Sequence, residues 1–308
     1  MRFVPILAVL LALMAKSSAA AGERVGGLRV DCRGERTNAP TVILESGAFG
    51  TADDWALVLP DLSRGGRVCA YDRGGVGGSA PRAGGTDVTA IAEELAGLLD
   101  RLGETAPVIL VGHSNGALYA EAFAALWPER VAGLVYVNGV TSNDNAEPLL
   151  LADLARERRL SNLAADAGAI GLASLGAGTV VEAEELPVEA AASKRRALSS
   201  PKRLRVARDE DRAIIPGLFT IAALGGSPPS IPTVSIYGGP VPGSPLASAW
   251  RRAEAVPSER AVHGWTLEAV GATHVSPLAR DRSYVLVAVN WLRSLAPSGH
   301  SPDADIGH

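Results

Sequence analysis

The 308-residue sequence lacks the patterns of several large ligand-binding classes. It has no P-loop, no His-Glu-x-x-His pair and no cysteine cluster, so we expect neither a metal nor a cofactor. The glycine-rich stretch 74–78 does not open a helix, and Pro81 interrupts it, which argues against a dinucleotide site. Aromatic residues make up only 5% of the chain, so small and aliphatic side chains must fill most of any core.

Only one hydrophobic run stands out, and it lies at the N-terminus. Arg2 precedes twelve apolar residues, Phe3 to Met14, and small residues follow at 17–21. Twelve residues are too few to cross a bilayer, which takes roughly 20, so a membrane anchor is the weaker interpretation. We predict a signal peptide over residues 1–21, export to the periplasm or the extracellular space, and no stable membrane insertion.

The charge balance gives no sign of a nucleic-acid partner. The net charge is −4, and removal of Arg2 and Lys16 with residues 1–20 makes it −6. An acidic protein has no general attraction to nucleic acid. The arginine-rich stretches 156–159 and 194–196 lie among Ala, Leu and Glu, which is typical of solvated helix faces.

Strand-like and helix-like segments alternate along the chain, which predicts an α/β fold with a mostly parallel sheet covered by helices on both faces. The stretch 139–230 breaks this rhythm because it contains no convincing strand, so we interpret it as a helical cap between core segments 22–138 and 231–296. The tail 297–308 has a composition typical of disorder. The strands are expected at 27–32, 41–45, 67–71, 107–111, 131–137, 231–237 and 265–270, and the helices at 53–62, 87–102, 115–126, 244–255 and 280–295.

The segment 108–116 contains the clearest sequence signal for a catalytic residue. It reads Val-Ile-Leu-Val-Gly-His-Ser-Asn-Gly and contains the pattern Gly-x-Ser-x-Gly. A buried strand leads into the pattern and a helix follows it, which is the setting of a nucleophilic serine on a strained turn. Ser114 would then lie at a helix N-terminus, where the helix dipole favours negative charge.

Several segments resemble the α/β-hydrolase family in the same order, over about residues 28–295. They are the loop 45–50, the Asp-Arg-containing loop 71–79, the serine turn 112–116 and the Gly-Ala-Thr-His sequence at 271–274. The resemblance implies an eight-stranded sheet with a cap after the sixth strand. In that sheet the strands of Cys32 and Cys69 would be neighbours, and with export this favours a disulfide over two free thiols.

Among the five histidines, His274 is placed best to act as a base. It follows the last strand, at the carboxyl edge where parallel sheets build their sites. A developing oxyanion needs donors, and the family pattern takes them from the backbone N–H groups after the nucleophile and in the loop after the third strand. These positions are Asn115 and Ala48.

The third member of a catalytic triad is not evident. No carboxylate lies after Arg212 until Glu254, which is about ten residues along a predicted helix. Some members of the family place the acid at the end of the sixth strand, where this chain has Asn138. An asparagine can orient an imidazole but cannot stabilise its charge. Asp144 or a carboxylate of the cap are the alternatives.

These residues together predict a serine hydrolase that cleaves a small-molecule carboxylic ester through an acyl-enzyme. An amide or a lactone would suit the same groups. The incomplete triad motivates two rival interpretations: a non-catalytic ligand-binding homologue, and a cofactor-free lyase or perhydrolase on the same fold.

Overall fold

The computed structural model describes residues 22–168, 170, 185–198, 200–238 and 244–296. The predicted signal peptide and the predicted disordered tail lie outside the described residues. Eight strands form one sheet in the order β1-β2-β4-β3-β5-β6-β7-β8. The strands are β1 (Glu23–Val25), β2 (Leu28–Arg33), β3 (Val42–Glu45), β4 (Val68–Tyr71), β5 (Val108–His113), β6 (Val131–Val137), β7 (Thr233–Tyr237) and β8 (Gly264–Glu268).

The sheet is mostly parallel, as the sequence predicts. The strands β3 to β8 run parallel to their neighbours, whereas β2 pairs antiparallel with both β1 and β4. The three-residue strand β1 was not predicted, because so short a segment shows no alternation. On the register of β2 and β4, Cys32 lies opposite Cys69, and the two residues form a disulfide bond.

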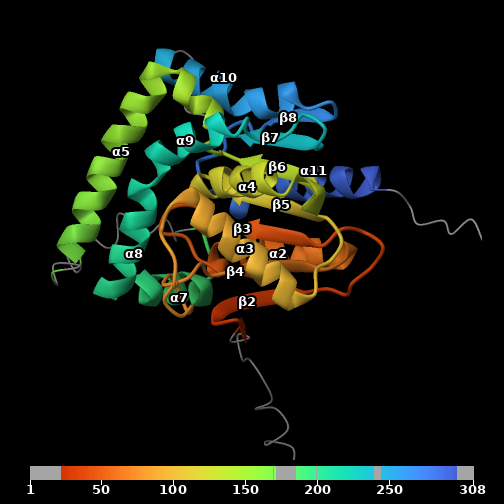
Figure 1. The fold of residues 1–308 in the computed structure, drawn as a ribbon, viewed down its shortest axis with the longest axis horizontal. Helices are drawn as coiled ribbons and strands as arrows, with labels where there is room; N and C mark the ends of the chain where they lie inside the picture. The colour runs from red at the N-terminus through yellow and green to blue at the C-terminus, as the bar shows by residue number, and fades with distance from the viewer. Residues whose placement is uncertain (1–21, 169, 171–184, 199, 239–243, 297–308) are drawn as a thin grey trace, which may run out of the picture.

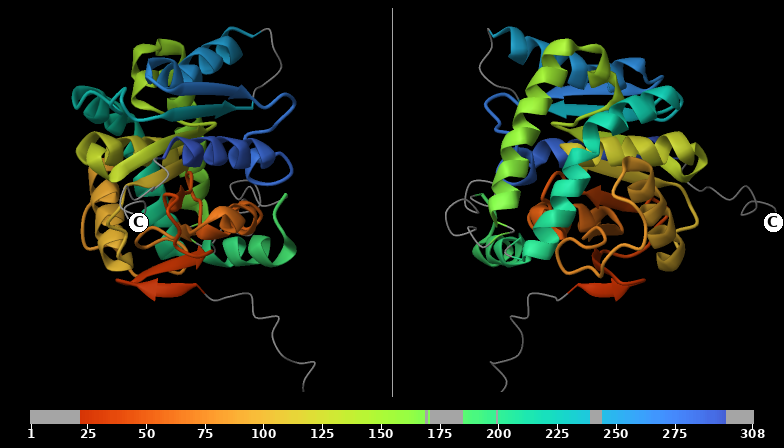
Figure 2. Two further views of the ribbon diagram at one scale, coloured as in Figure 1. Left: turned by 90° about the vertical axis from the view of Figure 1, so that its right-hand side faces the viewer. Right: turned by 60° about the vertical axis from the view of Figure 1, so that its left-hand side comes forward.

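Helices cover both faces of the sheet (Figures 1 and 2). On one face, α3 and α4 pack over alternate residues of the central strands, such as Leu110 of β5. On the other face, α2 and α11 pack over the intervening residues, such as Val111. These elements of the core are η1 (Ala52–Trp55), α2 (Val58–Leu62), η2 (Ser63–Gly65), α3 (Val88–Leu102), α4 (Asn115–Leu126), η3 (Pro128–Arg130), α10 (Pro245–Arg260), η7 (Ser276–Leu278) and α11 (Ser283–Leu295).

Local chemistry explains where several of these helices begin and end. The side chain of Asp87 accepts hydrogen bonds from the amides of the first turn of α3, and Gly103 ends that helix in a left-handed conformation. The single helix predicted over 53–62 is instead interrupted. Thr51 and Asp54 form a capping box that closes a short 3-10 turn, and α2 starts only at Val58.

The segment between β6 and β7 contains helices joined by short turns and no strand in its described part, and it forms the predicted cap. It contains η4 (Ser142–Ala146), α5 (Pro148–Ala167), α7 (Val188–Leu198), α8 (Pro201–Arg212) and α9 (Ile214–Ala223). Helices α5 and α8 pack against each other and stand at one end of the sheet, at the left of Figure 1. Within the described residues, no helix is both long and apolar enough to cross a membrane.

Candidate active site

Ser114 occupies a strained turn between β5 and α4. Its backbone has φ +53° and ψ −123°, a conformation that residues other than glycine rarely adopt. The flanking glycines are needed because the chain passes so close to its neighbours. A Cβ atom at Gly112 would lie 2.5 Å from the carbonyl oxygen of Gly116, and one at Gly116 would lie 2.4 Å from that of Glu45. The turn therefore pushes the serine out of the sheet.

Two residues proposed to supply backbone donors line the same cavity as this serine. Ala48 lies in the loop after β3, and Asn115 is the first residue of α4; both line the cavity with Ser114. Within the described residues, neither N–H group donates a hydrogen bond. A substrate oxygen between them would receive two donors from separate elements.

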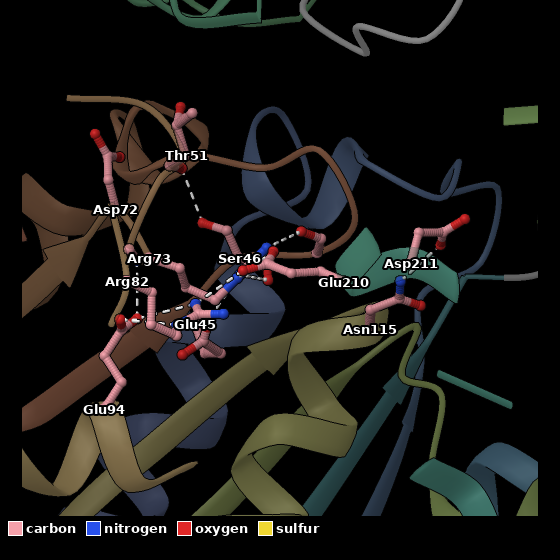
Figure 3. A network of polar contacts seen from close by, with 12 residues as sticks. Glu45, Ser46, Thr51, Asp72, Arg73, Arg82, Glu94, Asn115, Glu210 and Asp211 are labelled. Atoms are coloured by element: carbon pink, nitrogen blue, oxygen red, sulfur yellow. Dashed lines mark hydrogen bonds and ion pairs between the residues drawn. The ribbon is translucent and has the colours of Figure 1, made fainter. Parts of the chain in front are cut away.

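A buried arginine fixes the loop that contains Ala48 (Figure 3). Arg73 donates from Nη1 to the carbonyl oxygen of Ser46 at 2.6 Å and to the Glu45 carboxylate at 2.7 Å. Its Nη2 donates to the carbonyl oxygen of Gly47 at 3.0 Å. Glu45 also accepts a hydrogen bond from the hydroxyl of Tyr71. The carboxylates around Arg73 raise its pKa despite its burial, so the guanidinium stays charged.

His274 lies exposed in the loop that follows β8 and lines the cavity. The loop is closed by Ser276, whose hydroxyl accepts a hydrogen bond from the Thr273 amide at 2.9 Å while its own amide donates to Thr273 Oγ1 at 3.2 Å. No hydrogen bond joins Ser114 and the His274 imidazole among the described contacts. Such bonds are often long without substrate and shorten in the complex.

His113, which precedes the serine, also contacts His274. The two rings have centroids 4.8 Å apart, and His113 Nε2 lies 3.0 Å from the carbonyl oxygen of His274. Burial, followed by the proximity of His274, lowers the pKa of His113 well below its usual range. The neutral ring can therefore donate its Nε2 proton to that carbonyl. The sequence gives no sign of this contact between His113 and the loop of His274.

The side chain of Asn138 is bonded to the backbone of the histidine loop. Its Nδ2 donates to the carbonyl oxygen of His274 at 2.8 Å and to that of Thr273 at 3.4 Å, and its Oδ1 accepts the Gly238 amide at 2.5 Å. Both ends of the amide are thus committed to backbone atoms. In this arrangement Asn138 joins the ends of β6, β7 and β8, and its contact is with the loop of His274 rather than with the ring.

The carboxylates that could serve as the acid of a triad differ in whether they line the cavity. Asp144 is fully buried and accepts the Thr141 amide at 3.0 Å as part of a capping box, which places it in a turn rather than on the imidazole. Glu254, which the sequence places too far along its helix, does line the cavity, and so does Glu157 of α5. Desolvation and then Asp153 raise the pKa of Glu157, whereas the charge of His274 lowers it.

The cavity measures about 1130 Å³ and lies between the core and the cap. Its core wall holds Ser114 and His274, and its cap wall holds Glu157 and Arg158. That volume slightly exceeds the usual range for small-molecule sites. Within the described parts of the chain, no group of His, Cys, Asp and Glu side chains is arranged to hold a metal.

Comparison with known proteins places this arrangement in a family. Residues 40–211 match the family model described as alpha/beta hydrolase fold. The chain belongs to this family. The chain is 37% identical over 110 residues to the RutD protein of Pantoea ananatis, whose name proposes carbamate hydrolysis; the match covers 35% of this chain and 39% of that protein.

A second relative is the 2-hydroxy-6-oxo-2,4-heptadienoate hydrolase of Pseudomonas putida, which is 35% identical over 118 residues, covering 37% of this chain and 42% of that enzyme. The matches thus span about two fifths of the length of these relatives. Among solved structures, an esterase from Thermogutta terrifontis aligns with a TM-score of 0.65 at 21% identity, covering 87% of this chain and 94% of the esterase. That structural likeness concerns the fold.

Proposed function

We propose that this hydrolase is a serine esterase that acts through an acyl-enzyme on Ser114. The observation that carries the proposal is that Ser114, held at a positive φ, lines one cavity with His274 and with two backbone N–H groups that have no described partner. A nucleophile, a base and two oxyanion donors are the parts that acyl transfer needs. A small-molecule carboxylic ester is the proposed substrate class.

The proposed reaction proceeds in two halves. His274 removes the hydroxyl proton as Ser114 Oγ attacks the ester carbonyl carbon, and the amides of Ala48 and Asn115 hold the oxyanion. When the tetrahedral intermediate collapses, the C–O bond to the alcohol breaks, and the imidazolium gives its proton to the departing oxygen. Water, deprotonated by His274, then attacks the acyl-enzyme, and the acid leaves with Ser114 restored.

Two residues are proposed to support the histidine in place of a conventional acid. Asn138 is proposed to fix the backbone of the histidine loop. Its hydrogen bonds to the carbonyl oxygens of Thr273 and His274 support this role. Glu157 lines the same cavity as His274 and can offer negative charge toward the ring when it is ionised. A charge that is not hydrogen-bonded to the ring stabilises imidazolium less than a triad aspartate does, so we expect a modest turnover.

Export is proposed together with this activity. The predicted signal peptide and the disulfide between Cys32 and Cys69 both favour an oxidising compartment, where such bonds form and persist.

The proposal is tested by covalent labelling and by ester hydrolysis. We expect a fluorophosphonate to label the folded protein at Ser114, and p-nitrophenyl esters of short acids to be cleaved. Ser114→Ala and His274→Ala should abolish both signals. Ser294→Ala and His263→Ala are matched controls, since neither residue lines the cavity, and both variants should behave as the wild type. Absence of labelling in the folded wild-type protein would favour a ligand-binding homologue.

A further inference from the structure

Two consecutive carboxylates of the cap lie against the elements that supply the oxyanion donors. Glu210 and Asp211 lie in the last turn of α8, and their side chains are nearly fully buried. Figure 3 shows Glu210 reaching Arg73 and Asp211 facing Asn115. Each carboxylate therefore acts on a different half of the proposed oxyanion hole.

Glu210 acts through Arg73 on the peptide that contains the first donor. Its Oε2 accepts from Arg73 Nε at 3.0 Å, and the same guanidinium donates to the carbonyl oxygen of Gly47 at 3.0 Å. That carbonyl and the N–H of Ala48 belong to one planar peptide unit. Fixing the oxygen therefore fixes the direction of the N–H. A second arginine, Arg82, donates to Glu210 Oε1 at 2.8 Å and holds the carboxylate in place.

Asp211 acts on the residue that supplies the second donor. Its Oδ1 accepts from Asn115 Nδ2 at 3.1 Å, while Arg158 of α5 donates to Asn115 Oδ1 at 2.7 Å. The Asn115 side chain is thus held at both ends by the cap. Asn115 is the first residue of α4 and lines the cavity, and its backbone N–H has no described acceptor.

We propose that Glu210 and Asp211 are positioning residues, and that docking of α8 sets the geometry of both oxyanion donors. This inference rests on the proposed function, because it assigns the two N–H groups to an oxyanion. It implies that the cap does more than enclose the substrate: the hole takes its working geometry only when α8 is seated on the core.

The inference is tested by Glu210→Gln and Asp211→Asn, which keep size and remove charge. Removing one oxyanion donor from a serine protease lowers kcat by about 10² to 10³. A donor that remains but is poorly aimed should cost less, so we expect kcat to fall roughly tenfold in each variant with KM changed less than about threefold. Asp209→Asn is the matched control, because Asp209 lies on the same helix and pairs with Arg208 at the surface. It should leave kcat and KM unchanged.

Binding of a trifluoromethyl ketone gives a second readout, since its adduct with Ser114 carries an oxyanion. Both variants should bind the ketone about tenfold more weakly than the wild type, whereas a substrate-like ester should bind with similar KM. Circular dichroism and thermal unfolding identify any variant that does not fold. If burial of an unpaired arginine prevents Glu210→Gln from folding, Asp211→Asn carries the test.

The outcomes separate this inference from the proposed function. If Ser114→Ala retains turnover, the proposed function is wrong and no oxyanion hole exists to be positioned. If Ser114→Ala is inactive but the folded variants of Glu210 and Asp211 keep wild-type kcat, the inference alone is overturned. A rise in KM with unchanged kcat would also overturn it, because it would assign the carboxylates to substrate binding.

Discussion

Replacing Asn138 by aspartate distinguishes two roles for this residue. If Asn138 stands in for a triad acid, Asn138→Asp supplies the missing charge, and kcat should rise, in the limit by the ~10⁴ that the reverse change costs in a serine protease. The hydrogen bonds favour the opposite result. Nδ2 donates to the carbonyl oxygen of His274 at 2.8 Å, and a carboxylate oxygen in that position would face this acceptor without a proton.

The expected loss of stability in Asn138→Asp follows from these hydrogen bonds. The carbonyl oxygen of His274 loses one of its two donors and faces an unprotonated oxygen instead, which costs about 1–3 kcal/mol, while the bonds from His113 Nε2 and from the Gly238 amide are retained. A destabilisation of about 2 kcal/mol lowers Tm by roughly 4–8 °C in a chain of this size. Displacement of the His274 backbone should also lower kcat at least ~10-fold, because catalysis is sensitive to small misplacements.

The assay compares thermal unfolding and ester hydrolysis of the wild type, Asn138→Asp and Asn290→Asp. Asn290 is exposed on α11 and does not line the cavity, so its variant controls for the added charge. The introduced carboxyl group regains an O–H donor when it is protonated, so the destabilisation should be smaller at pH 5 than at pH 8. An Asn138→Asp protein with unchanged Tm and higher kcat would refute the positional role and restore the triad interpretation.

Three further changes test the fold around the site. Gly116→Ala places a Cβ 2.4 Å from a backbone carbonyl oxygen at the end of β3 and should destabilise the protein by about 3 kcal/mol in urea unfolding, whereas Gly84→Ala, with open space around it, should be neutral. Burial raises the pKa of Asp144 from 3.8 to about 7, so its ionisation costs stability as pH rises through this window. Asp144→Asn should therefore be more stable than the wild type at pH 8, by up to about 4 kcal/mol, and no more stable at pH 4; equal stability at both pH values would contradict this. Replacing Cys32 and Cys69 by serine opens a bridge across 37 positions and should cost about 3–4 kcal/mol, measured by calorimetry against the wild type with and without reductant.

The sequence predicts most of the core because its signals are local. A strand that runs into Gly-x-Ser-x-Gly and then into a helix identifies the turn of Ser114, and alternation of strands and helices indicates the parallel sheet. The segment 53–62 was predicted as one helix because its apolar spacing suits one. The capping box at Thr51 closes a separate turn instead, and spacing alone does not reveal it.

The polar contacts of the site depend on the folded arrangement of distant segments. Arg73 and Glu210 are 137 positions apart, and no periodicity indicates which cap helix lies on which core loop. The position of Asn138 at the end of β6 follows from the sequence, but its partners do not. Whether an amide bonds the ring of His274 or the carbonyl beside it depends on the course of the loop after β8.

The order of strands has a consequence for handling the protein. β1 is the outermost strand, and three others separate it from β5, which leads to Ser114. An affinity tag or a fluorescent protein fused ahead of Glu23 would start at the rim of the sheet farthest from β8, so it should leave substrate entry unobstructed. A capture surface could therefore hold the molecule by this rim while its turnover is recorded.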